Sequence, residues 1–368
     1  MKPKVFLICT GAGHINRGYE SFSIECFEAL KNSDKVNLYF LKGSGPSNEK
    51  EIKISCLKRN NTLTKKIAKR IKKETYWIEQ LTFLFGMLPS LIKHRPQVIY
   101  YSDFILGTWL WHLKRVFKFK YRLLFSNGAP NKPPFTRMDH VQQLLATYLN
   151  DAVNAGTSSN MQSLVPYGFN ICREGQLIND IEKNILKKKL GLPLNKEIII
   201  SVGAVNVGQK RMNYVIDEFR GMDDGKYFLL ILGQIDEQST SILEMAKEKL
   251  RYDSYIIKTV GGNEVNDYLS VADYFILASL SEGFGRVLIE ALYVGLIPII
   301  HDYPVARDVL HENGVFKDLT KQGELALAIK EINEMNISRE SLRRFAFENY
   351  SWEKLSKQYE KMIVSLTK

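Results

Sequence analysis

The sequence contains few cysteines, and their positions exclude two classes of small stabilised domain. Four cysteines are spread over 368 residues, with no Cys-x2-Cys pair and no histidine cluster near them. A zinc module or a disulfide framework needs cysteines at closer or denser spacing, so neither is expected. The pattern fits a reducing compartment. The four residues are Cys9, Cys26, Cys56 and Cys172.

Long apolar runs are also missing. The apolar stretch at residues 5–9 is far shorter than the core of a signal peptide. No segment approaches the roughly 20 apolar residues that a membrane-crossing helix needs. We therefore expect a protein that is made and kept in the cytoplasm, with the inner face of the cell membrane as a further place of action.

Acidic residues are scarce in the first half of the chain. Residues 1–165 carry 25 Lys+Arg against 11 Asp+Glu, whereas residues 166–368 carry 26 against 29. Residues 58–73 hold eight basic residues and no acidic one, and an apolar, aromatic-rich stretch follows. A basic segment followed by an apolar, aromatic-rich one is typical of a peripheral contact with an anionic membrane, here through residues 58–92. The same pattern also fits a helix whose apolar side packs on the core and whose cationic side only faces water. Nucleic acid is not expected, because no helix-turn-helix, RNA-binding aromatic pair or zinc module accompanies the charge.

The length and composition favour two globular domains. A chain of 368 residues is too long for one core of ordinary size. Hydrophobic residues make up 45% and charged residues 25%, which leaves no room for a largely disordered chain. We expect two α/β halves of comparable size.

The most informative stretch is residues 281–292, Ser-Glu-Gly-Phe-Gly-Arg-Val-Leu-Ile-Glu-Ala-Leu. The apolar pattern predicts a strand at 274–277 before it, a helix over 287–294 within it and a strand at 297–301 after it. Glycines in the turn allow the backbone to approach a ligand closely. The amides of a helix that begins there suit an anion such as a diphosphate.

Two glutamates frame this turn, and both can bind hydroxyl groups. Glu290, one turn inside the helix, can accept hydrogen bonds from a ribose, and Glu282, in the loop, can reach an attached sugar. The stretch closely resembles the Glu-x7-Glu motif of retaining glycosyltransferases of family 4, which adopt the GT-B fold. The alternative is a buried strand-turn-helix with two solvated carboxylates.

The resemblance implies an architecture and a donor site. The fold would be α/β of GT-B type, with two Rossmann-like, doubly wound parallel-sheet domains that face a central cleft. In the family the first glutamate contacts the donor sugar and the second the donor ribose, which gives these roles to Glu282 and Glu290. The same motif places Gly283, Phe284, Gly285, Arg286 and Val287 at the donor.

A second match lies at residues 203–211, which resemble the Gly-Arg-x-Lys-Gly segment that clamps the donor diphosphate. Lys210 matches the lysine, and Ala204 stands where the arginine is usual. Arg211 or Arg286 would then supply the missing charge; a surface Lys-Arg pair is the alternative. Thr259 and Val260 follow a predicted strand at 255–258, at the position where the family meets the nucleotide base through its backbone.

The first half begins with a predicted strand at 4–10, a glycine-rich loop at 11–18 and a helix over 19–30. Such a start is typical of a phosphate-binding doubly wound sheet. The loop is similar to the Gly-Gly-x-Glu loop of family 4, whose backbone faces the donor phosphates, and this likeness places Gly18 at the donor. Arg17 stands where that pattern has its first glycine.

The acceptor side is expected at the carboxyl ends of the strands in the first domain. Asn127 follows a predicted strand at 122–126 and opens the polar loop 127–139, which is a candidate acceptor wall. Family 4 enzymes commonly place a histidine or an acid near this point. We favour His140 as a catalytic residue over Asn127, with Asp139 beside it and His14 as a further acceptor-side candidate.

Residues 166–170, Pro-Tyr-Gly-Phe-Asn, resemble the family's Pro-Asn-Gly-Val-Asp crossover between domains. A strand is predicted just before them at 151–155. The expected domains are 1–165 on the acceptor side, 166–350 for the nucleotide sugar, and a helix at 351–368 that crosses back to the first domain. The resemblance covers about residues 5–365, with its specificity concentrated in 281–292.

The implied chemistry is transfer of a sugar from a nucleoside diphosphate donor to a hydroxyl acceptor, with retention of configuration and without a metal or other cofactor. Lys210 and Glu282 are the predicted catalytic residues beside His140. The acceptor would be a lipid-linked or other glycan in the synthesis of a surface polysaccharide or glycolipid. The rival from another class is a non-catalytic GT-B subunit that binds or scaffolds. A nucleotide-sugar epimerase would not be expected to carry the 281–292 motif.

Overall fold

The chain forms two compact units, each built around its own parallel sheet. The computed structural model describes residues 2–15, 17–129, 131–173, 177–222 and 224–367. The first unit comprises Met1–Asn170 and Tyr350–Lys368, and the second comprises Ile171–Asn349. The sequence interpretation divides the chain after residues 165 and 350, whereas the units divide after residues 170 and 349.

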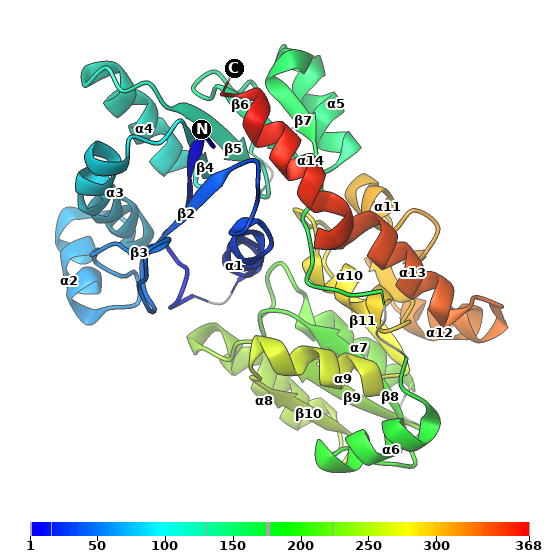
Figure 1. Ribbon diagram of the computed structural model, residues 1–368. Helices are drawn as coiled ribbons and strands as arrows, with labels where there is room; N and C mark the ends of the chain where they lie inside the picture. Colours follow the sequence, from blue (N-terminus) through cyan, green and yellow to red (C-terminus); the bar gives the residue numbers. More distant parts are fainter. Residues whose placement is uncertain (1, 16, 130, 174–176, 223, 368) are drawn as a thin grey trace. The chain divides into compact units, whose positions relative to one another are not determined.

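The first unit contains a seven-stranded sheet in the order β3-β2-β1-β4-β5-β6-β7, with every pairing parallel. Figure 1 shows α2, α3 and α4 along one flank of this sheet and α1 with α14 on the other. Its elements are β1 (Lys4–Cys9), α1 (Gly18–Leu30), β2 (Asn37–Lys42), β3 (Glu51–Lys53), α2 (Thr62–Ile71), α3 (Thr75–His94), β4 (Val98–Tyr101), α4 (Phe104–Val116), β5 (Arg122–Ser126), β6 (His140–Gln143), α5 (Ala146–Asn154), the 3-10 helix η1 (Ser159–Met161), β7 (Gln162–Leu164) and α14 (Trp352–Ser365).

The second unit contains a six-stranded sheet in the order β10-β9-β8-β11-β12-β13, again with parallel pairings. Helices α7, α8 and α12 pack together, as do α6, α9 and α10. Its elements are α6 (Asp180–Lys189), β8 (Glu197–Val202), α7 (Met212–Met222), β9 (Tyr227–Leu232), η2 (Glu237–Ser239), α8 (Thr240–Lys249), β10 (Tyr255–Lys258), η3 (Gly262–Glu264), α9 (Val265–Val271), β11 (Tyr274–Leu277), α10 (Arg286–Tyr293), β12 (Pro298–His301), α11 (Pro304–Leu310), β13 (Val315–Lys317), α12 (Glu324–Glu334) and α13 (Arg339–Tyr350).

Both sheets are doubly wound, as the sequence predicts. The central strands are short apolar runs that are buried on both faces, such as Ile198, Ile199 and Ile200 in β8. In each sheet the strand order reverses once, between β1 and β4 in the first unit and between β8 and β11 in the second. Loops that leave adjacent strands diverge at such a switch point, which makes it the usual ligand position in an open parallel sheet.

One predicted element is wrong. Residues 151–155, expected as a strand, lie in or just after helix α5. Tyr148 and Ala152 are its buried residues, and they stand four apart, which is the spacing of a helix face. The neighbouring Asp151, Val153 and Asn154 are exposed, so the segment has no strand-like alternation to bury.

The C-terminal helix α14 belongs to the first unit, and buried polar contacts hold it there. Gln142 Nε2 on β6 donates to the Tyr359 hydroxyl at 2.9 Å, and that hydroxyl donates to the Pro166 carbonyl at 2.7 Å. Phe22 on α1 stacks near Trp352 at a ring-centroid distance of 5.9 Å. These contacts fix α14 against the sheet and α1.

Candidate functional site

Lys210 and Glu282, two residues predicted at the donor, lie at the carboxyl edge of the second sheet. The loop after β8 carries Lys210, and the loop after β11 carries Glu282. Because β8 and β11 are neighbours that pair in register, these two loops leave the sheet side by side at its switch point. The fold therefore brings together two residues that are 72 positions apart in the sequence.

Lys210 and Glu282 form an ion pair at this point. Lys210 Nζ contacts Glu282 Oε1, and Gln209 Nε2 donates to Glu282 Oε2 at 3.1 Å. The side chains are only 18% and 7% exposed, so little water screens the pair. A Cβ at Gly203 would lie 2.9 Å from Lys210 Cδ. The absence of a side chain at Gly203 thus makes room for the lysine stem.

Helix α10 begins immediately after this loop, as predicted. Its cap, Gly285, has a φ of 76°, a conformation that favours glycine. A Cβ built on Gly285 would lie 3.8 Å from Glu282 Cβ, so the glutamate and the helix start are adjacent. Arg286 and Val287 form the first turn and are half-buried. A helix does not use its first-turn amides internally, and this terminus is therefore suited to an anion.

Other residues of the motif differ in exposure. Phe284 is buried, whereas Gly283 and Glu290 are half-buried. Glu290 lies on α10 beyond the first turn. Phe284 therefore supports the loop from the inside, and Gly283 and Glu290 remain accessible to a ligand.

Arg211 and Thr259 connect neighbouring loops. The Arg211 guanidinium donates to the carbonyl oxygens of Leu319 at 2.7 Å and Ala278 at 3.3 Å. The Thr259 hydroxyl donates to the Gly233 carbonyl at 2.8 Å. Arg211 thus ties strand ends together, whereas Arg286 is the first residue of α10, at the helix end that suits a diphosphate. Val260 follows Thr259 and is half-buried.

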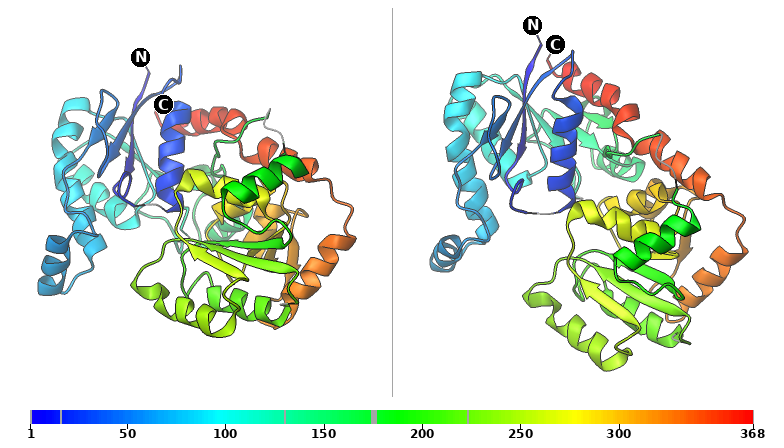
Figure 2. Two further views of the ribbon diagram at one scale, coloured as in Figure 1. Left: turned by 90° about the horizontal axis from the view of Figure 1, so that it is seen from below. Right: turned by 60° about the horizontal axis from the view of Figure 1, so that its bottom comes forward.

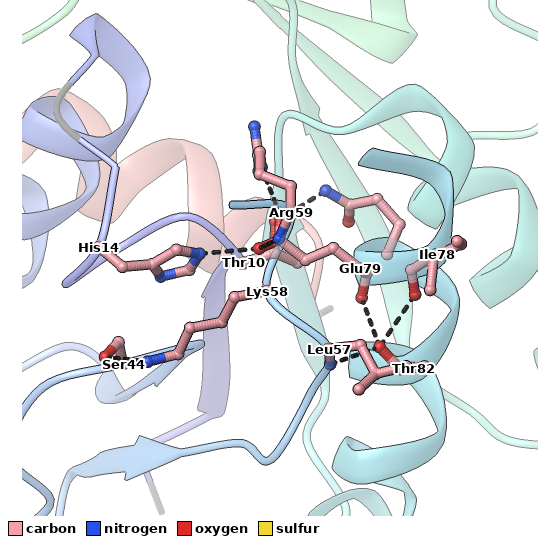
Figure 3. A network of polar contacts seen from close by, with 10 residues as sticks. Thr10, His14, Ser44, Leu57, Lys58, Arg59, Ile78, Glu79 and Thr82 are labelled. Atoms are coloured by element: carbon pink, nitrogen blue, oxygen red, sulfur yellow. Dashed lines mark hydrogen bonds and ion pairs between the residues drawn. The ribbon is translucent and has the colours of Figure 1, made fainter. Parts of the chain in front are cut away.

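In the first unit, His14 lies in the loop after β1 and joins a buried charge cluster (Figure 3). Its Nε2 hydrogen-bonds Glu79 Oε1 on α3 at 2.7 Å, and Arg59 Nε contacts Glu79 Oε2 at 2.5 Å. The Glu79 side chain is fully buried, and that of His14 is 6% exposed. Glu79 thereby fixes the imidazole orientation. His14 Nδ1 is buried and has no hydrogen-bond partner among the described residues.

Two further acids lie near the switch point of the first sheet, between β1 and β4. Glu20, on α1, occupies the space beside Gly11, and burial raises the pKa of its carboxyl. Asp103 caps α4 by accepting from the Leu106 amide at 2.9 Å and also accepts from the Tyr76 hydroxyl. Burial raises the pKa of Asp103 to about 6. Gly18 is the first residue of α1; Asn16, in the loop before it, lies outside the described residues.

The predicted grouping of Asn127 with Asp139 and His140 is not what the structure shows. Asn127 follows β5 at the carboxyl edge, where its Nδ2 donates to Gln143 Oε1 at 2.9 Å. Loop 127–139 then returns the chain to the opposite edge, because β6 is parallel to β5 and must start at its amino end. His140 is the first residue of β6, so it and Asp139 lie away from Asn127 and from the His14 loop. Pro130, in this loop, is outside the described residues.

Both residues have local partners at the amino edge. Asp139 pairs with Lys114 at 2.8 Å and with Arg122 at 3.3 Å. His140 Nε2 lies 2.8 Å from the Ser163 hydroxyl, and burial lowers the pKa of its imidazole. These contacts favour a role in packing the sheet for both, and neither is included in the site proposed below.

Sequence reasoning missed Gln209, Glu79 and Asp103. Gln209 stands next to Lys210, and its position in the matched segment was the available signal. Glu79 lies inside an apolar helix, where a single carboxylate among hydrophobic residues indicates a buried partner. Asp103 lies two residues after the end of β4, which is the switch-point strand next to β1.

Comparison with solved structures shows the fold of the molecule. The chain has the GT-B fold: it resembles a sucrose-phosphate synthase structure from Thermosynechococcus elongatus with a TM-score of 0.79, at 16% identity and 99% coverage of both chains. It also resembles HepE of Anabaena in complex with UDP and glucose, with a TM-score of 0.74, at 12% identity and coverage of 99% and 100%. Residues 182–349 match the family Glycosyl transferases group 1.

The relatives found by sequence match this chain over part of its length. TuaC, a glycosyltransferase provisionally assigned to teichuronic acid biosynthesis in Bacillus subtilis (strain 168), is 31% identical over 140 residues, which cover 38% of this chain and 32% of TuaC. Glycogen synthase of Bacillus anthracis is 26% identical over 200 residues, or 50% of this chain and 41% of the synthase. The chain thus spans well under half the length of either relative.

Proposed function

We propose that the protein is a glycosyltransferase that moves a sugar from a nucleoside diphosphate sugar to a hydroxyl group of an acceptor. The observation that carries this proposal is the Lys210–Glu282 pair, buried at the switch point of the second sheet and adjacent to the start of α10. A cation and a helix N-terminus together suit a diphosphate. The family match of residues 182–349 supports the same reading.

Each donor residue then has a role. Lys210 and the amides of Gly285, Arg286 and Val287 would neutralise the charge that develops on the leaving diphosphate. Glu282 would bind hydroxyls of the donor sugar while still bonded to Lys210, because its two carboxylate oxygens can accept several hydrogen bonds. The three donors of the Lys210 ammonium group likewise allow it to bind Glu282 and a phosphate together. Glu290 would bind the ribose. The backbone at Thr259 and Val260 would meet the base.

Retention and metal independence are parts of the proposal. We adopt same-face attack, in which the donor phosphate takes the proton of the acceptor hydroxyl. Metal independence is proposed because Lys210 and the amides at the start of α10 would take the place of a divalent cation at the diphosphate. A covalent sugar adduct on a carboxylate of the protein would contradict the single-step route, and mass spectrometry of the enzyme during turnover would detect it.

The acceptor is proposed to be a lipid-linked or other glycan in the synthesis of a surface polysaccharide or glycolipid, at the inner face of the cell membrane. The likeness to TuaC supports this choice. His14 and Asn127 lie at the carboxyl edge of the first sheet and are the residues retained for the acceptor side.

Thermal-shift screening with UDP, GDP, ADP and their sugar conjugates would identify the donor. With that donor, Lys210→Ala should lower turnover about 100-fold or more, because a charge that stabilises the leaving group is lost. Glu290→Ala should mainly weaken donor binding. Lys249→Ala is the control, since it removes an ion pair with Asp217 in the same unit, away from the site. Full activity of the Lys210 and Glu290 variants would refute these assignments.

The rival function is a non-catalytic GT-B subunit, for which Ala204 in place of the usual arginine and Arg17 in place of the usual glycine are the supporting observations. Such a subunit would bind a nucleotide sugar, if at all, without consuming it. Slow hydrolysis of the identified donor by the purified chain, absent in Lys210→Ala, would decide for the enzyme.

A further inference from the structure

The outer helices of the first unit carry an unusual excess of positive charge. Between Lys58 and Lys120 the sequence has 14 Lys+Arg and three Asp+Glu. Two of these three acids do not offset the charge at the surface: Glu79 is buried in the cluster with His14, and Asp103 is engaged with α4 and Tyr76. The exposed acid is Glu74.

Large apolar side chains are exposed on the same helices. On α3, Phe85 is 62% exposed and Ile92 is 61% exposed. They are seven residues apart and so lie on one face of the helix. At the end of α4, Val116 is 72% exposed and Phe117 is 64% exposed. Buried residues of α3 such as Phe83 and Met87 pack into the core, so the exposed set is separate from the face that holds the helix in place.

The exposed residues at the ends of α3 and α4 lie on one flank of the unit. Trp77 on α3 packs edge-on against Trp109 on α4 at 5.4 Å, and the views of Figures 1 and 2 agree that α2, α3 and α4 share this flank. Helix α3 leads into β4 and α4 leads into β5, and the starts of these strands pair directly. Both helices therefore end at the same edge of the sheet.

The ends of these helices form what we name the basic flank end. It comprises Ile92, Lys93, Arg95, Arg115, Val116, Phe117, Lys118 and Lys120. Its three apolar residues and its five cations are all exposed. Exposed apolar groups within a ring of cations are unusual on a surface that meets only water.

We infer that the basic flank end docks on the surface of an anionic lipid bilayer, with Phe117, Val116 and Ile92 in the headgroup region and the surrounding cations against lipid phosphates. Interfacial binding combines apolar groups that enter the headgroup region with cations that attract anionic lipids, and this surface has both. No helix among the described residues could cross a bilayer, so the contact would lie on the membrane surface. This inference rests on the proposed function for its consequence: docking would hold the enzyme at a membrane that carries a lipid-linked acceptor, with His14 and Asn127 at the opposite, carboxyl edge of the same sheet.

A nucleic acid would use the cations but not the apolar groups. Exposed Ile and Val side chains offer no stacking surface for bases, whereas they gain from transfer into the lipid interface. The observations therefore favour lipid. Binding to nucleic acid that is unaffected by loss of Val116 and Phe117, without binding to vesicles, would overturn the inference.

The test is co-sedimentation of the full chain with vesicles of phosphatidylcholine alone or with phosphatidylglycerol added, without any nucleotide sugar. We expect binding to the anionic vesicles that weakens as salt is raised, and little binding to phosphatidylcholine alone. The double variant Val116→Ser, Phe117→Ser should bind at least tenfold more weakly. Lys118→Gln with Lys120→Gln should weaken binding and flatten its salt dependence.

The matched control is Ile181→Ser in the second unit, where a side chain of 73% exposure is replaced in the same way. It should bind like the wild type. Failure of the wild type to bind anionic vesicles, or binding by the Val116 and Phe117 variant equal to that of Ile181→Ser, would overturn the inference. Because no donor is present, such a failure leaves the proposed transfer reaction untouched, and a failure to bind any nucleotide sugar leaves the membrane result untouched.

Discussion

At the scale of single residues, the site depends on charges that are buried only because each has a partner. Glu282 is held by Lys210 and Gln209, and Glu79 is held by His14 and Arg59. An unpaired buried carboxylate would be strongly destabilising, so these partners are needed for folding as well as for binding. The sequence identified Lys210 and Glu282 one at a time. It could not pair them, because the pairing depends on β8 and β11 becoming neighbours.

Asp103 gives a prediction about pH. Burial raises its pKa from 3.8 to about 6, so between these values the folded protein binds a proton that the unfolded chain has lost. Its contribution to the free energy of unfolding is therefore fully present below the unfolded pKa and is lost as pH rises through about 6. The loss is at most about 3 kcal/mol. Asp103→Asn stays uncharged, and its stability relative to the wild type should rise over this interval.

The measurement is urea unfolding followed by tryptophan fluorescence from about pH 4 to about pH 7. All four tryptophans, Trp77, Trp109, Trp111 and Trp352, lie in the first unit, so their signal follows the unit that contains Asp103. Parallel stability curves for the two proteins would show that Asp103 titrates alike in the folded and unfolded states, contrary to the prediction.

At the scale of helices and strands, the sequence predicts the second unit closely. Strands β10 and β11 were expected at the residues where they occur, because each is an apolar run between polar or turn-forming residues. Helix α5 was missed, since its two buried residues are too few to show a clear period. The position of His140 was misjudged for another reason: a loop between parallel strands ends at the opposite edge of the sheet.

The attachment of α14 gives a prediction at this scale. Tyr359→Phe removes the hydroxyl that donates to Pro166 and accepts from Gln142 in the core. The Pro166 carbonyl would lose its Tyr359 donor, and Gln142 Nε2 would keep only its bond to the Val165 carbonyl, so the free energy of unfolding should fall by about 1–3 kcal/mol. Tyr39→Phe is the control, since that half-buried hydroxyl accepts one 3.3 Å bond from Asn37 on the same strand.

Tryptophan fluorescence again reports on the correct unit, and hydrogen exchange would locate the change in α14. If Tyr359→Phe and Tyr39→Phe unfold at the same urea concentration, the hydroxyl of Tyr359 does not hold the helix in the way described. Faster hydrogen exchange confined to α14 in the Tyr359→Phe variant would support the role of this hydroxyl in attaching the helix.

At the scale of the whole molecule, the two units differ in charge and in composition. The excess of positive charge belongs to residues 1–165, and all tryptophans lie in the first unit. The second unit has its own sheet and its own apolar core, formed by residues such as Ile199, Phe219 and Ile276. It also contains the entire match to Glycosyl transferases group 1. Folding and donor recognition by the second unit therefore need not depend on the first.

A fragment comprising residues 171–349 should accordingly fold and bind a nucleoside diphosphate. Lys210, Glu282, Gly285 and Glu290 all lie within it, so its preference among UDP, GDP and ADP should equal that of the full chain. Circular dichroism would establish folding, and calorimetry would measure the affinities. The fragment with Lys210→Ala should bind more weakly, whereas the fragment with Lys249→Ala should bind equally well. A folded fragment that fails to bind the nucleotide bound by the full chain would show that the second unit alone does not form the donor site.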